Sequence, residues 1–152
     1  MRLIVMIWAM VWQLHAGDVK QVVFDVTTGD MKRFEQIVFE TTKNLAAHYA
    51  EQGDAYRAVF VIHGDAYRFF FKDLTGTPYA RDTQLYMKQP EYAERLAGLV
   101  ATYQVAFEVC SFGMKSRRLP FEQLYPFVTP IFSATAGLIE WQEKGYAYVP
   151  VR

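Results

Sequence analysis

Apolar and polar positions follow one another along the chain in two spacings, one typical of strands and the other of helices. Residues 21–26 (QVVFDV) form a short run of β-branched and apolar residues that predicts a strand, and a turn cluster at 27–30 ends it. Asp30 can accept the first free backbone N–H groups of a helix, and apolar residues recur at helical spacing from there to about Gln52. The predicted inner face of this helix consists of Phe34, Ile37, Val38, Thr41, Leu45 and Tyr49. A second strand, at 57–62, follows the helix.

The second half of the chain continues this order after a less regular segment at 66–88. Within that segment, the phenylalanines at 69–71 predict a short helix packed on the sheet. Pro90 is expected to open a second long helix, because proline fits the first helical turn. Its inner face is predicted to consist of Tyr92, Leu96, Leu99, Val100 and Tyr103. Further elements are expected as strands at 105–109, 127–132 and 146–151, with a helix capped by Ser133 before the last strand.

This order of strands and helices defines the expected fold class. Strand–helix–strand connections of this length favour parallel strands with helices on both faces. We therefore predict a three-layer α/β/α domain around a mostly parallel, five-stranded sheet. Because proline cannot donate to a central ladder, Pro130 is expected to place the strand at 127–132 at an edge of that sheet or to make this strand irregular.

The first 16 residues have a different pattern. Arg2 is followed by an uninterrupted apolar run at 3–12, and residues 13–16 then turn polar and end in the small residue Ala16. This is the order of a secretory signal peptide, which predicts a mature domain at 17–152 that is periplasmic or secreted. The apolar run is far shorter than the roughly 20 residues that span a bilayer, so we expect no stable membrane anchor after cleavage. A first strand or a buried helix is the alternative interpretation of the same run.

Composition and charge narrow the function classes. The chain has 152 residues, 16 of them basic and 16 acidic, and 52% are hydrophobic, which suits one domain with one core. Balanced charge argues against a nucleic-acid-binding protein, since phosphate contacts need a local surplus of Lys and Arg. The single cysteine, Cys110, excludes an internal disulfide and a cysteine-cluster metal site. His48 has no other ligand residue at a suitable spacing, so we predict no metal site, and we expect no cofactor.

Functional groups of a parallel sheet collect beyond the carboxyl ends of its strands, and three segments qualify: 27–30, 63–65 and 110–116. Cys110 stands between a strand and a short helix or loop. A cysteine becomes reactive as the thiolate, which nearby cations and a helix amino terminus favour. The cations that follow the cysteine are Lys115, Arg117 and Arg118. The alternative is a buried, inert cysteine at the end of an apolar strand.

The other two segments carry weaker signals. Thr28 and its neighbours at 27–30 are similar to a flavodoxin phosphate loop, but Asp30 has the wrong charge for phosphate, and a helix cap is favoured. His63 can orient a ligand or take part in proton transfer from a thiol, or it can be a satisfied histidine at a strand end. Asp25 and Glu108 are expected to be single strand carboxylates rather than an acid–base pair.

The segment 105–114 (VAFEVCSFGM), a strand that leads into Cys110, resembles the strand-to-cysteine segment of the DsrE/DsrF-like sulfur-relay family. The resemblance covers about 19–151 and is also carried by residues 44–45 (NL), 61–64 (VIHG), Leu119, 125–126 (YP) and 137–148 (GLIEWQEKGYAY).

This resemblance implies a small α/β protein that assembles as a trimer or hexamer. It also implies that Cys110 accepts sulfane sulfur as a persulfide and passes it to a partner thiol, as a sulfur carrier or sulfurtransferase. The implied partners are sulfur donor and acceptor proteins or small sulfur species. The binding residues expected around Cys110 are His63, Gly64, Lys115, Arg117, Arg118 and Thr28. The alternative function is a non-enzymatic oligomeric binding module in which Cys110 is packed and inert.

Overall fold

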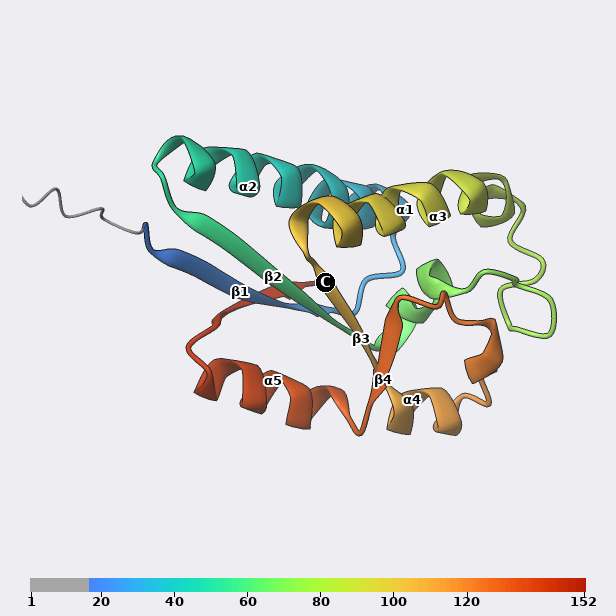
Figure 1. The fold of residues 1–152 in the computed structure, drawn as a ribbon. Helices are drawn as coiled ribbons and strands as arrows, with labels where there is room; N and C mark the ends of the chain where they lie inside the picture. Colours follow the sequence, from blue (N-terminus) through green and yellow to red (C-terminus); the bar gives the residue numbers. More distant parts are fainter. Residues whose placement is uncertain (1–16) are drawn as a thin grey trace, which may run out of the picture.

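Five runs rich in β-branched and aromatic residues form a parallel sheet in the computed structural model, which describes residues 17–152 (Figure 1). The strands are β1 (Val19–Val26), β2 (Ala55–Ile62), β3 (Ala106–Cys110), β4 (Val128–Ile131) and β5 (Ala147–Val151). They lie in the order β4-β3-β2-β1-β5, and every neighbouring pair is parallel. The predicted fold class is therefore confirmed. The predicted signal peptide, residues 1–16, lies outside the described residues.

Helices cover both faces of this sheet (Figure 1). One face is covered by α3 (Thr83–Tyr103) and by a continuous helical stretch made of α1 (Met31–Phe34), the π-helical η1 (Glu35–Thr41) and α2 (Thr42–Glu51). The other face holds α4 (Ser111–Ser116) and α5 (Ala134–Glu143). Two 3₁₀ segments in the connections are η2 (Gly64–Phe70) and η3 (Phe121–Gln123). Between residues 17 and 152, no helix combines the length and the apolar character needed to cross a membrane.

A row of aromatic side chains packs on one face of the sheet. Phe24, Phe60 and Phe107 lie on three neighbouring strands, with ring centroids 4.7 Å apart for the first pair and 5.4 Å for the second. Phe70 of η2 joins this row to Phe34 of α1, at 5.3 Å from Phe107 and 5.7 Å from Phe34. This face is therefore the one that α1, α2 and α3 cover.

The opposite face of the sheet carries polar side chains. Asp25 and Glu108 each follow one of these phenylalanines along a strand, so they point to the α5 side. Trp141 of α5 agrees with this, because its indole N–H donates to the Glu108 carboxylate at 2.8 Å. Cys110 lies two residues beyond Glu108 and therefore faces the same side.

The first long helix begins where the sequence predicts, but its inner face is displaced. Asp30 caps the helix by accepting the backbone N–H of Arg33 at 2.7 Å. The π-helical turn then rotates the following residues relative to a regular α-helix. Phe39 and Thr42 are consequently fully buried, whereas Thr41, predicted on the inner face, is only half-buried. A uniform helical spacing cannot predict this rotation.

The prediction that Pro90 opens the second long helix is wrong. This helix, α3, begins at Thr83, and Asp82 caps it by accepting the backbone N–H of Leu85 at 2.9 Å. Pro90 lies inside the helix, on an exposed position. The first part of α3 was missed because Leu85 is the only buried residue between positions 83 and 91, so apolar spacing does not mark it.

The phenylalanines of the least regular segment enter the core as predicted. Phe69 and Phe70 lie at the end of the 3₁₀ segment η2 and are buried. Phe71 is extended and forms an isolated antiparallel bridge with Leu124. The predicted short helix is therefore present, and it ends one residue earlier.

The two outermost strands of the sheet are β4 and β5. Pro130 lies in β4, which confirms the predicted edge position, and Pro150 lies in β5. A proline has no N–H to donate to a central ladder, so both prolines occupy strands that have only one neighbour.

Candidate functional site at the carboxyl edge of the sheet

The carboxyl ends of neighbouring strands bring the predicted site segments together. Val26 is in register with Ile62, and Ile62 with Val109, so the residues that follow these strands lie along one edge of the sheet. His63 and Cys110 each come one residue beyond the registered pair of Ile62 and Val109. They therefore occupy neighbouring positions at the edge where parallel α/β sheets place their reactive groups.

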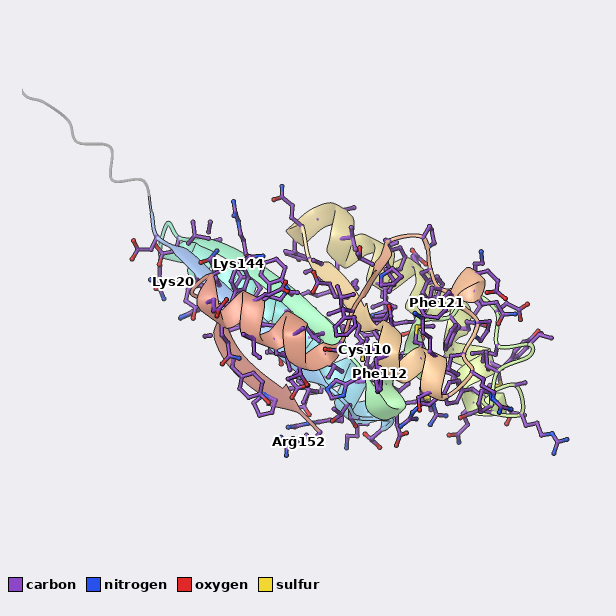
Figure 2. The ribbon with its side chains drawn as sticks, turned by 90° about the horizontal axis from the view of Figure 1, so that it is seen from below. Lys20, Cys110, Phe112, Phe121, Lys144 and Arg152 are labelled. Carbon is purple, nitrogen blue, oxygen red and sulfur yellow. The ribbon has the colours of Figure 1, made fainter. Side chains whose placement is uncertain are left out.

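Cys110 is the last residue of β3 and caps the short helix α4 (Figure 2). Its side chain is buried, with 6% of the residue exposed. The Cys110 sulfur accepts the backbone N–H of Gly113 at 3.4 Å. A donated N–H stabilises negative charge on sulfur, which is the charge that a reacting thiolate carries.

Tyr67 of η2 fixes the backbone at Cys110. Its hydroxyl donates to the Cys110 carbonyl oxygen at 2.8 Å. Burial first, and then interaction with Cys110, raise the pKa of Tyr67 well above its usual value, so the hydroxyl stays protonated and able to donate. The contact is tight, because a Cβ atom on Gly113 would lie 2.3 Å from the Tyr67 hydroxyl.

The three predicted cations lie on the surface after Cys110. Arg117 forms an ion pair with Asp65 at 3.0 Å, and this interaction raises the pKa of its guanidinium. Lys115 lies on the last turn of α4, and Arg118 follows the helix with a positive φ of 54°. Within residues 17–152, no hydrogen bond joins any of the three to Cys110. The three side chains therefore add positive charge to the surface after Cys110 without a hydrogen bond to its sulfur.

His63 is held by the carboxylate of Asp25 on the neighbouring strand β1. Its Nε2 lies 2.6 Å from Oδ1 of Asp25, and only 7% of Asp25 is exposed. The expectation that Asp25 is a single strand carboxylate is therefore wrong, and its partner is His63 rather than Glu108. The physical reason is the register: β1 and β2 are adjacent, and both side chains point to the α5 face. The sequence did offer one signal of this pair, because Asp25 is a carboxylate within the otherwise apolar strand run at 21–26.

Tyr148 completes this cluster from the far side of β1. Its hydroxyl donates to Oδ2 of Asp25 at 2.7 Å, and this hydrogen bond is the main reason that the pKa of Tyr148 is raised. Sequence reasoning missed Tyr148 because nothing in the residue pattern shows that β5 returns to lie beside β1.

Gly64 and Thr28 shape the backbone of the neighbouring loops. Gly64 has a positive φ of 63°, and a Cβ atom there would lie 3.3 Å from the carbonyl oxygen of Thr27. The Thr28 hydroxyl accepts the backbone N–H of Asp30 at 3.1 Å, just before α1. Both residues therefore stand at the same edge as Cys110, in positions that a tight turn requires.

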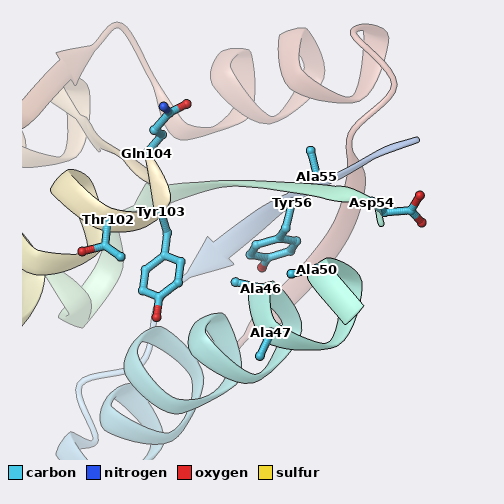
Figure 3. Close-up of a pocket in the computed structure, with 9 residues that line it drawn as sticks. All are labelled: Ala46, Ala47, Ala50, Asp54, Ala55, Tyr56, Thr102, Tyr103 and Gln104. Carbon is cyan, nitrogen blue, oxygen red and sulfur yellow. The ribbon is translucent and has the colours of Figure 1, made fainter. Parts of the chain in front are cut away.

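Metal ligation and a surface hollow are the two other features that bear on a site. Within residues 17–152, no group of three His, Cys, Asp or Glu side chains is placed to hold a metal ion. A hollow of about 380 Å³ lies between α2 and the end of α3, lined in part by Ala46, Ala50, Tyr56 and Tyr103 (Figure 3). It lies at the amino-terminal end of β2, at the opposite edge of the sheet from Cys110.

Fold and site together define a class: a three-layer α/β domain with an all-parallel sheet and one thiol at the carboxyl end of a strand. The DsrE/DsrF-like family matches residues 21–151, and the chain belongs to that family.

The chain is also similar to individual proteins. It is 28% identical over 137 residues to an uncharacterized protein of Aquifex aeolicus (strain VF5), and this match covers 90% of the chain. The chain spans 58% of the length of that relative. A solved structure of a protein of unknown function from Methanobacterium thermoautotrophicum has a similar fold, with a TM-score of 0.61 and 17% sequence identity. That match covers 88% of this chain and 98% of the solved one, and it shows the fold alone.

Proposed function

We propose that the protein is a sulfur carrier that accepts sulfane sulfur on Cys110 as a persulfide and passes it to a partner thiol. One observation carries the proposal: the single cysteine lies at the carboxyl edge of the sheet, with the backbone N–H of Gly113 on its sulfur. Membership of the DsrE/DsrF-like family suggests a sulfur-relay role in general. The persulfide on Cys110, the sulfur donor and the sulfur acceptor go beyond family membership and are our proposal.

The transfer needs no oxidant. The Cys110 thiolate attacks the outer sulfur of a donor R–S–SH, a new sulfur–sulfur bond forms, and the bond between R–S and the outer sulfur breaks. The leaving R–S⁻ takes up the proton that the thiol lost, so the products are R–SH and a Cys110 persulfide. A partner thiolate then attacks the outer sulfur of this persulfide and regenerates Cys110.

We also propose that the domain acts outside the cytoplasm, as residues 17–152, after removal of the leader at 1–16. The charged start, the apolar run and the small Ala16 support this proposal. Expression of the full chain in a bacterium, followed by intact mass measurement of the exported fraction, tests it. A chain that keeps residues 1–16 and stays in the cytoplasm contradicts it.

Sulfur loading tests the role of Cys110. Incubation with polysulfide should add the mass of sulfur to the protein, and cyanide should release this sulfur. Cys110→Ser should abolish the addition, whereas Ser111→Ala, a change at the next residue, should retain it. A wild-type protein that gains no cyanide-labile sulfur from polysulfide or from a thiosulfate-derived donor contradicts the proposal.

The surface cations are expected to attract anionic sulfur donors. In the double variant Lys115→Ala, Arg118→Ala, loading by polysulfide should slow by a few-fold at low salt, with a smaller effect at high salt, because salt screens surface charges. Alkylation of Cys110 by neutral iodoacetamide should be unchanged. The double variant Lys20→Ala, Lys144→Ala, which removes two positive charges at the end of the molecule far from Cys110 (Figure 2), serves as the charge-matched control. Equal slowing of both reagents contradicts a role in donor attraction.

A second function, that of a non-enzymatic oligomeric binding module, is supported by the exposed apolar surface beside α4. Phe112 is 69% exposed and Phe132 is 80% exposed, and the backbone N–H of Phe112 donates to the carbonyl of Phe132 at 3.2 Å. With Cys110 buried, this alternative predicts slow alkylation of the native thiol and an oligomer that Cys110→Ser leaves intact. Alkylation rates of the native protein separate the two functions. Under both functions we propose that the protein is a trimer or hexamer, and light scattering measures this oligomeric state.

A further inference from the structure

The geometry points to a proton-transfer unit beside Cys110, in which His63 takes the proton of the Cys110 thiol while Asp25 and Tyr148 orient the His63 ring. The inference rests on the proposed function for its reaction and deepens it by naming the proton acceptor. His63 is the group that exchanges the proton, and Asp25 and Tyr148 are positioning residues.

His63 and Cys110 lie at adjacent positions of the sheet edge. His63 and Cys110 are neighbours across β2 and β3, one residue beyond the registered pair of Ile62 and Val109. Neighbouring strands lie about 4.8 Å apart. Side chains alternate along a strand, and His63 is still extended, with φ −156° and ψ −172°. His63 and Cys110 therefore point to the same α5 side of the sheet.

The carboxylate of Asp25 has a fixed orientation. Both oxygens of Asp25 are used, since Oδ1 lies 2.6 Å from Nε2 of His63 and Oδ2 accepts the Tyr148 hydroxyl at 2.7 Å. With 7% of the residue exposed, Asp25 has little water to replace these partners. Tyr148 thus prevents the carboxylate from turning away from His63.

The contact with Asp25 selects one tautomer of the His63 ring. An ionised carboxylate can only accept hydrogen bonds, so it favours the neutral tautomer that carries its proton on Nε2. The Nδ1 atom then has a free lone pair, and within residues 17–152 it has no hydrogen-bond partner. The His63 side chain is 31% exposed, so water reaches the ring. The unit therefore presents a proton acceptor at the edge where the thiol lies.

The proton that the Cys110 thiol loses passes to His63 and ends on the leaving group. No direct hydrogen bond joins His63 to Cys110 within residues 17–152, so the proton passes through one water molecule to Nδ1. The thiolate then attacks the donor R–S–SH, and the protonated His63 returns the proton to the leaving R–S⁻. The ring ends in its starting state, and Asp25 stays ionised throughout.

The purified protein allows a direct test with variants of each member. His63→Gln keeps a side chain that can donate to Asp25 but removes the proton acceptor, and Asp25→Asn keeps the shape but removes the charge. Tyr148→Phe removes only the hydroxyl. His48→Gln is the matched control, because His48 lies on the exposed surface of α2. Two rates are measured, alkylation of Cys110 by iodoacetamide and sulfur loading from polysulfide, together with the urea midpoint of unfolding.

We expect His63→Gln to slow both reactions by about tenfold or more, in line with the loss of general base catalysis. Asp25→Asn should slow them by several-fold and Tyr148→Phe less, whereas His48→Gln should leave them unchanged. Imidazole added to His63→Ala should restore part of the rate, which a purely structural role does not allow. Nitrogen-15 NMR should show Nδ1 of His63 unprotonated in the neutral wild-type ring and a change in tautomer in Asp25→Asn.

The outcomes separate this inference from the proposed function. If Cys110→Ser abolishes sulfur loading but His63→Gln leaves both rates unchanged, the proton-transfer unit is wrong and the sulfur carrier stands. If the wild type gains no sulfur but alkylation depends on His63 and is rescued by imidazole, the unit stands and the sulfur carrier is wrong. Slowing by His63→Gln that imidazole does not rescue in His63→Ala, together with a lowered urea midpoint, overturns the unit in favour of a structural pair.

Discussion

At the scale of single residues, two hydrogen bonds hold Cys110 in place, one at its sulfur and one at its carbonyl oxygen. The Cys110 sulfur accepts an N–H from Gly113, while the Cys110 carbonyl accepts the hydroxyl of Tyr67. Gly113 has to approach Tyr67 closely for both bonds to form, and only a residue without a Cβ atom leaves room. The lack of a side chain at Gly113 is therefore part of the geometry of the site.

Gly113→Ala tests this packing. The added methyl group displaces the Tyr67 hydroxyl, so we expect the free energy of unfolding to fall by about 1–3 kcal/mol, the usual effect of overpacking. The rate of Cys110 alkylation should change as well, because the carbonyl oxygen of Cys110 loses its hydrogen bond from the Tyr67 hydroxyl. Urea unfolding and iodoacetamide kinetics measure the two effects.

Gly98→Ala provides the matched control within α3. Nothing lies within 4 Å of a Cβ atom at Gly98, so this change should raise stability by about 0.5–1 kcal/mol through helix propensity alone. If the two substitutions have the same effect on stability, the tight contact at Gly113 does not exist in solution.

At the scale of the helices, the π-helical turn η1 determines which side chains of the first long helix reach the core. It brings Thr42 into a fully buried position. The Thr42 hydroxyl has no hydrogen-bond partner among residues 17–152. A buried hydroxyl without a partner reduces stability, because folding removes its hydrogen bonds to water.

Thr42→Val should therefore stabilise the protein. The replacement exchanges the hydroxyl for a methyl group of similar size, and we expect the free energy of unfolding to rise by about 1 kcal/mol. Thr42→Ser keeps the hydroxyl and loses the methyl group, so it should lower stability by a similar amount. A loss of stability in Thr42→Val, measured by urea unfolding, contradicts the assignment of an unpaired hydroxyl.

At the scale of the whole molecule, the fold buries several tyrosine hydroxyls. Burial raises the pKa of Tyr125 to about 12, and it is also the main cause of the raised pKa values of Tyr56, Tyr67 and Tyr92. In an unfolded chain a tyrosine ionises near pH 10. The folded state therefore holds its protons more tightly than the unfolded state does.

The free energy of unfolding should accordingly decrease as the pH rises above about 10. The contribution of these tyrosines is fully present below about pH 10 and is lost as the pH rises towards 12, because the unfolded state loses its protons first. The urea midpoint measured between these values should decrease steadily. Tyr125→Phe should flatten the decrease, whereas Tyr86→Phe, at a tyrosine that is 67% exposed, should not. A profile that Tyr125→Phe leaves unchanged contradicts this explanation.

The pattern of neighbouring residues predicts most elements of this fold. Where that prediction is wrong, there is a physical reason. The strand ending at Val26 and the cap at Asp30 depend on neighbouring residues, so the sequence shows them directly. The π-helical turn and the polar start of α3 depend on packing against distant residues, so spacing alone does not show them.

The same distinction holds at the candidate site. Cys110 and His63 were found because each follows an apolar strand run. Their relation to Asp25 and Tyr148 requires the strand order, in which β1 lies between β2 and β5. A parallel sheet brings together residues that are far apart in sequence, and no local signal specifies which strands become neighbours.

Pro130 and Pro150 have a consequence for how copies of this chain can meet. The free edge of a sheet is a template on which a strand from another molecule can pair. A proline in each outermost strand interrupts the row of backbone donors at both edges, so strand-to-strand growth into larger aggregates is disfavoured. If copies of this chain associate, the edge prolines favour contact through side-chain surfaces, such as the exposed aromatic rings beside α4, over pairing of strands.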